Sequence, residues 1–283
     1  MSVSGKHASG TQLLQIDWQG RPIALEYAWV GPQDGPQDSA QPVLVFLHEG
    51  LGSVAIWKGY PERLCQALGM RGLVYSRPGY GRSTPRAADE HWGPDFMHRQ
   101  ASEVLPALLS ALDIRQPWLF GHSDGASIAL LHAALLPGQA AGVVVEAPHV
   151  FVEEITLAAI RQARQAYEEQ GLRARLARYH ADVDSAFYGW NDAWLAPEFR
   201  AWSMEELLPA IRCPVLAMQG EQDEYGTLEQ IHRIGRLVPG AKTLAIAHCG
   251  HSVHFDQPQA LTREAGQFII THLPERHKTL ETP

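Results

Sequence analysis

Six short apolar segments recur along the chain, and together they restrict the fold more than any other feature of the sequence. They are PVLVFLH (42–48), GLVYS (72–76), PWLFGH (117–122), AGVVVEA (141–147), CPVLAMQG (213–220) and KTLAIAH (242–248). Each is continuously apolar rather than alternating, which is typical of strands buried on both faces of a parallel sheet. Because helix-like stretches separate them, the pattern predicts a doubly wound, mostly parallel α/β fold. Residues 11–20 and 21–30 flank a glycine-containing turn and predict an antiparallel hairpin at the sheet edge.

The alternation of strand and helix stops between the fourth and fifth of these segments. Residues 148–211 contain no buried-strand pattern; they are helix-like at first and then rich in aromatic residues. We expect this stretch to form a helical cap, inserted between strands 6 and 7 of the sheet. The core would then comprise 11–147 and 212–273, with loose termini at 1–10 and 274–283.

Composition narrows the class of protein and its partners. The net charge of −8 disfavours nucleic acid and acidic membranes, and no basic run opposes that conclusion. Three scattered cysteines do not suggest a disulfide framework, and neither a signal peptide nor a membrane span is evident. We therefore expect a cytoplasmic protein, a monomer or homodimer, that binds a small molecule and needs no cofactor and no metal.

The segment Gly121-His122-Ser123-Asp124-Gly125 joins a predicted buried strand to a predicted helix. A serine at such a junction suits a nucleophile elbow, in which a sharp turn exposes the hydroxyl and flanking glycines prevent clashes. A serine that only caps the helix is the competing interpretation, and the pentapeptide alone does not decide between them.

A serine nucleophile needs a base, usually a histidine that a carboxylate orients. Asp223 and His251 follow the last two predicted strands in the order serine, acid, histidine that is expected on this fold, and each lies where a strand ends. Glu221 and Glu224 are rival acids. His248, which we expect to end its strand and pack, and His254, which we expect to be structural, are rival bases. The cluster HCGHSVH could also suggest a metal, although the sequence supplies no second group of ligands.

The remaining requirement is a pair of N–H donors for the negative oxygen that forms when a carbonyl is attacked. One donor should be the amide of Asp124, and the other should come from the loop His48–Ser53, whose glycines allow close approach. Gly50 is favoured as the second donor, and Leu51 is the alternative.

Taken together, these motifs and the segment YSRPGYGRS (75–83) resemble the α/β-hydrolase superfamily, in particular capped serine hydrolases with a His-Gly-x-x-Gly-Ser loop. The resemblance extends from about Leu13 to Leu273. It implies Ser123 as nucleophile, His251 as base and Asp223 as the orienting acid. Two positions depart from the family pattern: Glu49 replaces a common glycine, and Asp124 replaces an apolar residue. We expect both carboxylates to turn away from the nascent oxyanion.

The fold hosts many reactions, so the substrate has to be argued from the site. A serine nucleophile favours hydrolysis of a carboxylic ester, lactone or thioester. Hydrolysis of carbon–carbon bonds in ring-cleavage diketones is an alternative within the same class, and a receptor that binds a small ligand without turnover is an alternative from another class. We expect the pocket walls to include five residues: Glu49, Trp57, Tyr188, Trp190 and Trp194.

Arginines that could meet a substrate carboxylate are Arg77 and those of the predicted cap: Arg161, Arg164, Arg173, Arg175 and Arg178. Arginines at this density on a helix more often form its solvated face.

Overall fold

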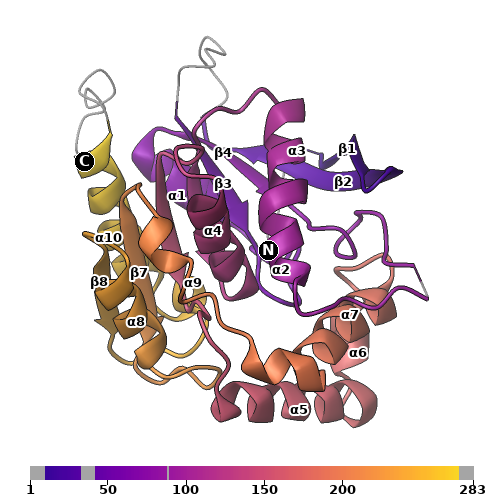
Figure 1. Cartoon of the computed structure of the whole chain (residues 1–283). Coiled ribbons are helices and arrows are strands. Elements are labelled where there is room, and N and C mark those ends of the chain that lie inside the picture. Colours follow the sequence, from indigo (N-terminus) through magenta and orange to yellow (C-terminus); the bar gives the residue numbers. More distant parts are fainter. Residues whose placement is uncertain (1–9, 33–41, 88, 274–283) are drawn as a thin grey trace, which may run out of the picture.

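The computed structural model describes residues 10–32, 42–87 and 89–273, and it centres on one eight-stranded sheet (Figure 1). The strand order is β1-β2-β4-β3-β5-β6-β7-β8, and every pairing from β4 to β8 is parallel. The strands are β1 Gln12–Trp18, β2 Arg21–Val30, β3 Val43–Leu47, β4 Arg71–Tyr75, β5 Trp118–His122, β6 Gly142–Glu146, β7 Val215–Gly220 and β8 Lys242–Ile246. All six apolar segments are therefore strands, as the sequence predicts.

Helices connect the strands and cover both faces of the sheet (Figure 1). The α-helices are α1 Tyr60–Leu68, α2 Phe96–Arg99, α3 Leu105–Ala111, α4 Asp124–Leu135, α5 Glu154–Glu169, α6 Leu172–Leu176, α7 Val183–Leu195, α8 Glu229–Leu237, α9 Val253–Asp256 and α10 Pro258–His272. The mostly parallel α/β fold that the sequence predicts is confirmed, and its β1–β2 hairpin is antiparallel.

Successive residues of the central strands point into two different hydrophobic cores. On β3, Val45 and Leu47 belong to the core that α3, α4 and α8 cover, whereas Leu44 and Phe46 belong to the core under α1 and α10. The five residues of β5 are all buried. Because both faces are covered, the strands carry continuous apolar runs instead of alternating polar ones.

The helices α5, α6 and α7, which we call the inserted helices, lie between β6 and β7 in the chain and apart from the layered core (Figure 1). An isolated antiparallel bridge between Phe151 and Ser203 joins the segments that enter and leave them. The division of the chain into a separate core and cap stays a prediction, and the predicted loose termini, except for Gly10, lie outside the described residues.

Two local features differ in detail from what the sequence suggests. The helix-like stretch at 95–112 is helical from Phe96 to Ala111, as expected, but a π-helical turn at Gln100–Val104, two residues before Pro106, interrupts the α-helix. Proline lacks an N–H and cannot complete a regular α-helical ladder, and the wider turn accommodates this gap. His248 does not end its strand or pack: β8 ends at Ile246, and His248 is exposed in a left-handed turn with φ of 53°.

Two further features concern the cysteines and the length of the helices. Cys65, Cys213 and Cys249 are all free thiols. Among the residues described, no helix has both the length and the hydropathy needed to cross a bilayer.

Candidate active site

The turn between β5 and α4 places Ser123 at the tip of the strand with an unusual backbone conformation. Its φ is 53° and its ψ is −118°, a combination that side-chain-bearing residues rarely adopt outside functional sites. The flanking glycines are required by close packing. A Cβ at Gly121 would lie 2.4 Å from the carbonyl oxygen of Gly125, and one at Gly125 would lie 2.1 Å from that of Leu47.

Ser123, His251 and Asp223 form a hydrogen-bonded line, which we call the Ser–His–Asp cluster. His251 Nε2 lies 2.9 Å from Ser123 Oγ, and His251 Nδ1 lies 2.8 Å from Asp223 Oδ1. Because an ionised carboxylate can only accept, Nδ1 carries the proton and Nε2 is free to accept from the hydroxyl. The three side chains, from three different loops, meet as the sequence analysis expected.

Asp223 is held in its ionised form by its surroundings. Its carboxylate also accepts from the backbone N–H of Tyr225 at 2.8 Å and from Gln219 Nε2 at 3.1 Å. Burial alone would raise the pKa of Asp223, but the bonds from His251 and Tyr225 outweigh it and hold the pKa below its ordinary value.

The rival acids and bases have other positions. Glu224 accepts from the backbone N–H of His251 at 3.2 Å and does not bind the imidazole, and Glu221 is exposed. His254 lies on α9 and is bonded to Glu146, in agreement with its expected structural role.

The loop after β3 fixes the orientation of the peptide that joins Glu49 to Gly50. The Glu49 carbonyl accepts from three donors: Gly52 N at 3.1 Å, His48 Nδ1 at 2.7 Å and Arg77 Nη2 at 2.8 Å. In a trans peptide the N–H points opposite to the C=O, so the Gly50 amide is directed away from these donors. Gly50 lines the cavity at Ser123, and its N–H has no hydrogen-bond partner within the described residues.

Asp124 is turned aside by the inserted helices. Its Oδ1 accepts from the indole N–H of Trp194 at 3.1 Å, and its Oδ2 lies 3.7 Å from Arg77 Nη2. Burial is the largest influence and raises the pKa of Asp124, while Arg77 and Trp194 oppose that rise. The backbone N–H of Asp124, at the first position of α4, makes no hydrogen bond to the described chain.

Glu49 also turns toward a partner, but it stays at the cavity wall with 22% of its side chain exposed. Its Oε2 lies 3.7 Å from Nδ1 of His122. Burial would raise the pKa of Glu49, but the close approach and the charge of His122 lower it to about 2. For His122, burial is outweighed by Glu146 and Glu49, which raise the pKa to about 9. An imidazolium therefore lies directly before the serine at neutral pH.

Behind the serine, His122, Glu146 and His254 form a fully buried cluster whose ligand atoms lie within 4.8 Å of one another. These groups already bind each other or the backbone. Glu146 accepts from His254 Nδ1 at 2.6 Å and from its N–H at 2.9 Å, and His122 Nε2 donates to the His251 carbonyl at 3.1 Å. We interpret the cluster as an ion-pair network that fixes the loop carrying His251.

A cavity of about 280 Å³ opens at Ser123. The inserted helices contribute Thr156, Ile160, Trp190 and Trp194 to its wall, and the core contributes Glu49, Gly50, Leu51, His122, Ser123, Asp124, His149, Glu224, Tyr225, His251 and Ser252. A Cβ at Gly50 would lie 2.1 Å from Trp190 Nε1, so the glycine lets this indole close over the loop.

Two predicted wall residues lie elsewhere. Trp57 is 1% exposed and packs between Phe46 and the ring of His254, in the core under α1 and α10. Trp57 follows the loop at Gly50 closely in sequence, but its side chain lies in the core under α1 and α10 and not in the cavity. Tyr188 packs edge-on against Tyr167, within the inserted helices. The predicted positions of Glu49, Trp190 and Trp194 on the wall agree with the structure.

No arginine or lysine lines this cavity among the residues described. Arg77 is completely buried beneath the loop. Arg161 pairs with Glu154, Arg164 with Asp192 and Arg173 with Asp184, all at the surface of the inserted helices. This solvated arrangement is the one expected for arginines at such density on a helix.

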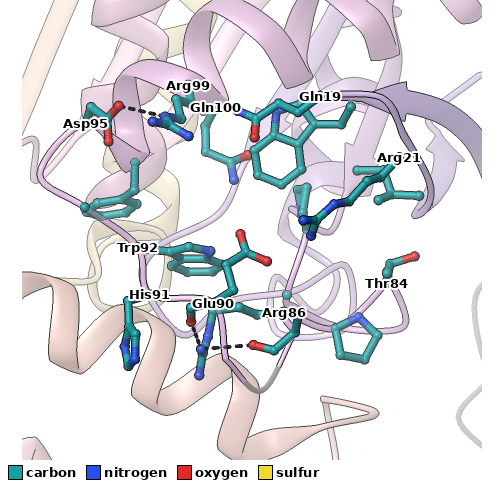
Figure 2. Close-up of a pocket in the computed structure, with 18 of the residues that line it drawn as sticks. Gln19, Arg21, Thr84, Arg86, Glu90, His91, Trp92, Asp95, Arg99 and Gln100 are labelled. Atoms are coloured by element: carbon teal, nitrogen blue, oxygen red, sulfur yellow. Dashed lines mark hydrogen bonds and ion pairs between the residues drawn. The ribbon is translucent and has the colours of Figure 1, made fainter.

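A larger cavity of about 550 Å³ lies beside the β1–β2 hairpin, and Figure 2 shows its polar and aromatic wall. Arg86, Trp92 and Gln100 contribute to it, but Ser123, His251 and Asp223 do not. Its hydroxyl-bearing residue, Thr84, accepts from the backbone N–H of Ala24 at 2.8 Å, and within the described residues its hydroxyl makes no hydrogen bond to the acidic or histidine side chains of this wall, which are Glu90, His91 and Asp95. The Ser–His–Asp cluster lies at the smaller cavity.

His149 is one of several wall residues that were not singled out from the sequence. It is 2% exposed, and its ring centroid lies 5.8 Å from that of His251 and 5.2 Å from that of Trp194. Burial, and then the charge of His251, lower the pKa of His149 to about 3, so it is neutral. The only signal in the sequence is its place directly after an apolar strand, in Ala-Pro-His.

Comparison with known proteins agrees with this geometry. Residues 44–265 match the alpha/beta hydrolase family. The chain is 26% identical over 280 residues to the sn-1-specific diacylglycerol lipase ABHD11 of Mus musculus, covering 88% of this chain and 86% of that protein. It is 30% identical over 265 residues to the 2-succinyl-6-hydroxy-2,4-cyclohexadiene-1-carboxylate synthase of Yersinia enterocolitica, with coverages of 84% and 90%.

Among solved structures, a thermophilic esterase from Thermogutta terrifontis superposes with a TM-score of 0.70 at 19% identity, covering 92% of this chain and 99% of that one. This likeness supports the fold. The family match spans most of the chain, and the site lies where parallel strands of such a fold end. The chain therefore belongs to the alpha/beta hydrolase family.

Proposed function

We propose that this protein is a serine hydrolase that cleaves a small, uncharged carboxylic ester, lactone or thioester through an acyl-enzyme. Ser123 is the nucleophile, His251 the general base and Asp223 the acid that orients it. The observation that carries the proposal is the continuous line Asp223–His251–Ser123, with bonds of 2.8 Å and 2.9 Å, at the mouth of a cavity.

In acylation, Ser123 Oγ attacks the carbonyl carbon while His251 Nε2 takes the hydroxyl proton. The tetrahedral intermediate collapses, the bond to the leaving alcohol or thiol breaks, and His251 returns the proton to that group. Asp223 stays ionised and stabilises the imidazolium between the two transfers. Its depressed pKa and its bonds from Tyr225 and Gln219 suit this role.

In deacylation, water enters the leaving-group side and His251 removes one of its protons as the oxygen attacks the acyl carbon. The second tetrahedral intermediate collapses, the bond to Ser123 Oγ breaks, and the proton on His251 restores the hydroxyl. The carboxylic acid then leaves, and the cluster returns to its starting state.

The N–H groups of Gly50 and Asp124 would stabilise the oxyanion in both steps. The triply bonded Glu49 carbonyl supports this assignment because it fixes the Gly50 peptide before substrate arrives. Donors that need no reorganisation stabilise a developing charge most effectively. The bond from Trp194 keeps the Asp124 carboxyl away from the site of negative charge.

The test is labelling with a fluorophosphonate, followed by turnover of p-nitrophenyl esters of increasing acyl length and of a ring-cleavage diketone. We expect wild type to be labelled and to hydrolyse short esters, and Ser123→Ala to lose both. Ser110→Ala, at an exposed position on α3, is the matched control and should behave as wild type.

Ester turnover that Ser123→Ala retains would refute the acyl-enzyme. Cleavage of the diketone in preference to every ester would move the reaction to carbon–carbon hydrolysis. Thermal stabilisation by a ligand, without labelling or turnover, would favour a receptor instead.

A further inference from the structure

His149 is a polar side chain without a polar partner at the wall of the reaction cavity. Neither ring nitrogen makes a hydrogen bond to the described residues; Nδ1 is fully buried, so Nε2 is the nitrogen that a group in the cavity can reach. Buried polar atoms in proteins are nearly always paired, and an unpaired one costs stability. The ring is also close to the reacting atoms, because it lies beside His251, whose Nε2 contacts Ser123 Oγ.

The backbone before His149 adopts an unfavourable conformation. Ala147 has a φ of 48°, in the left-handed region, although it is not glycine. It also precedes Pro148, and a residue before proline is normally restricted to extended conformations. Such strain persists only where the surrounding structure enforces it, and it is concentrated at functional positions.

Two sets of contacts enforce the position of this segment. Ser127 Oγ, on α4, donates to the His149 carbonyl at 2.6 Å and accepts from its N–H at 3.2 Å. Farther along, the buried Gln230 of α8 accepts from Val150 N–H at 2.7 Å and donates to the Phe151 carbonyl at 3.1 Å.

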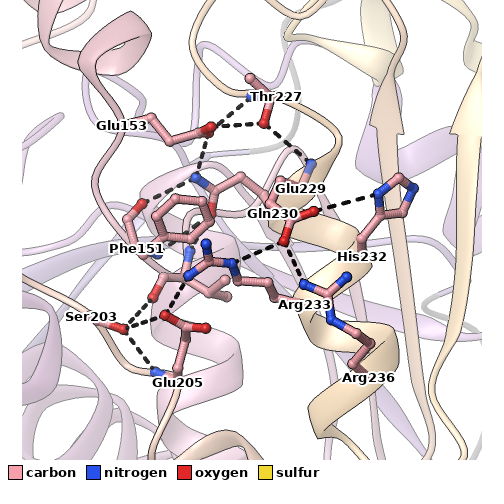
Figure 3. Close-up of polar contacts among 11 residues, drawn as sticks. Phe151, Glu153, Ser203, Glu205, Thr227, Glu229, Gln230, His232, Arg233 and Arg236 are labelled. Carbon is pink, nitrogen blue, oxygen red and sulfur yellow. Dashed lines mark hydrogen bonds and ion pairs between the residues drawn. The ribbon is translucent and has the colours of Figure 1, made fainter.

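The segment beyond is anchored as well (Figure 3). Glu153 accepts from Gln230 Nε2 at 2.7 Å and from the hydroxyl of Thr227 at 2.7 Å. The Arg233 guanidinium lies 3.7 Å from the centroid of the Phe151 ring and also binds Glu205, in the segment that leaves the inserted helices. These contacts hold the chain on both sides of the imidazole while its ring stays unbonded, an arrangement that suits a ligand contact better than a packing role.

The charges around the cavity define what the ligand group can be. The wall holds the carboxyl groups of Glu49, Asp124 and Glu224 and no lysine or arginine within the described residues. The cation there, His122, is already paired with Glu49. A substrate carboxylate would therefore meet no free positive charge, whereas a hydroxyl could donate to, or accept from, a neutral imidazole.

We propose that His149 is a specificity-determining residue that hydrogen-bonds a hydroxyl group on the acyl part of the substrate, and that the preferred substrates are uncharged hydroxyacyl esters. This inference rests on the proposed serine hydrolase function and narrows its substrate class. A site built to bond a hydroxyl rejects the analogue that lacks it, because the protein group is then left unpaired.

The experiment compares phenyl butanoate with its 2-hydroxy and 3-hydroxy derivatives and with monophenyl succinate, which carries a carboxylate. For wild type, we expect kcat/KM for one hydroxy ester to exceed that for phenyl butanoate by about 10-fold or more. We expect the succinate ester to be the poorest substrate of the four.

In His149→Phe the preference should fall to about 1, mainly through loss of activity on the hydroxy ester. His149→Gln keeps a donor and an acceptor and should retain part of the preference. His232→Phe, at an exposed position on α8, is the matched control. Fluorophosphonate labelling of His149→Phe tests Ser123 and His251 separately, because the probe carries no hydroxyl for His149 to bind, and His232→Phe should be labelled at the wild-type rate.

A wild-type enzyme without a preference for either hydroxy ester, or a preference that His149→Phe retains, would overturn the inference. Slow labelling of a folded His149→Phe would also overturn it, because the imidazole would then act through His251. If wild type itself were not labelled, the proposed function would fail and this inference with it.

Discussion

The imidazolium of His122 makes the stability of the protein depend on pH in a way that can be calculated. Glu146 and Glu49 outweigh burial and raise the pKa of His122 from 6.5 to about 9. The difference is 9 − 6.5 = 2.5 pH units, which at about 1.36 kcal/mol per unit gives about 3 kcal/mol of stability. Because the pKa is raised on folding, this contribution is complete below pH 6.5 and is lost as the pH rises through 9.

The stability contribution of Glu49 depends on pH in the opposite direction. Its pKa is lowered from 4.5 to about 2, so its contribution is present above pH 4.5 and is lost as the pH falls through 2. Both members of the pair are charged between these limits. The loss of stability that belongs to His122 should therefore appear on the alkaline side alone.

The assay is denaturant unfolding of wild type and His122→Asn at intervals from pH 6 to 10. We expect the free energy of unfolding of wild type to fall by about 3 kcal/mol more than that of the variant across this range. Subtracting the two curves cancels other titrating groups, and His232→Asn, at an exposed histidine, should parallel wild type. If wild type and His122→Asn give parallel curves, the imidazole is not protonated in the folded state and the reasoning is refuted.

Three further predictions concern the site. Asp223→Asn should keep the fold but lower kcat by about 10³–10⁴, because the imidazole would hold its proton on the wrong nitrogen, and unchanged single-turnover rates would place the acid elsewhere. Gly50→Ala should lower kcat by about 10-fold or more, because its Cβ would lie 2.1 Å from Trp190 Nε1. Adding Trp190→Phe should restore part of the loss. Full activity of Gly50→Ala alone would show that the loop has space for this methyl group. Ala147→Gly should raise the free energy of unfolding, measured in thermal melts, by about 0.5–1 kcal/mol, because glycine adopts the left-handed conformation without strain. A clear decrease would mean that packing of the Ala147 methyl group contributes more than the strain costs.

The strands and the Ser–His–Asp cluster could be predicted because simple physical rules determine them. A strand buried on both faces must be continuously apolar, as β5 is, and parallel strands end at the same edge of their sheet. Residues that follow different strands, such as Ser123 and His251, are therefore brought together whatever the length of chain between them. The glycines of the elbow were predictable for the same reason, since the turn leaves no space for a side chain.

The residues of the cavity wall were less predictable, because the direction in which each side chain points depends on how the helices pack on the sheet. Trp57 follows the loop at Gly50 closely in sequence, yet it lies beneath the sheet. His149 has no periodicity or motif to mark it, and its importance arises from contacts with Ser127 and Gln230, which are distant in the sequence. Only Pro106 gave a local warning of the π-helical turn that interrupts the helix expected there.

The bond from Trp194 to Asp124 has a consequence for how such enzymes can diversify. The indole belongs to the inserted helices, whereas the carboxyl belongs to the residue that follows Ser123. Exchanging these helices for those of a relative would leave a buried acid without its donor, directly beside Ser123. Substitutions at the two positions should therefore arise together, and transplanting this region between homologues should succeed only when the residue after the nucleophile is exchanged with it.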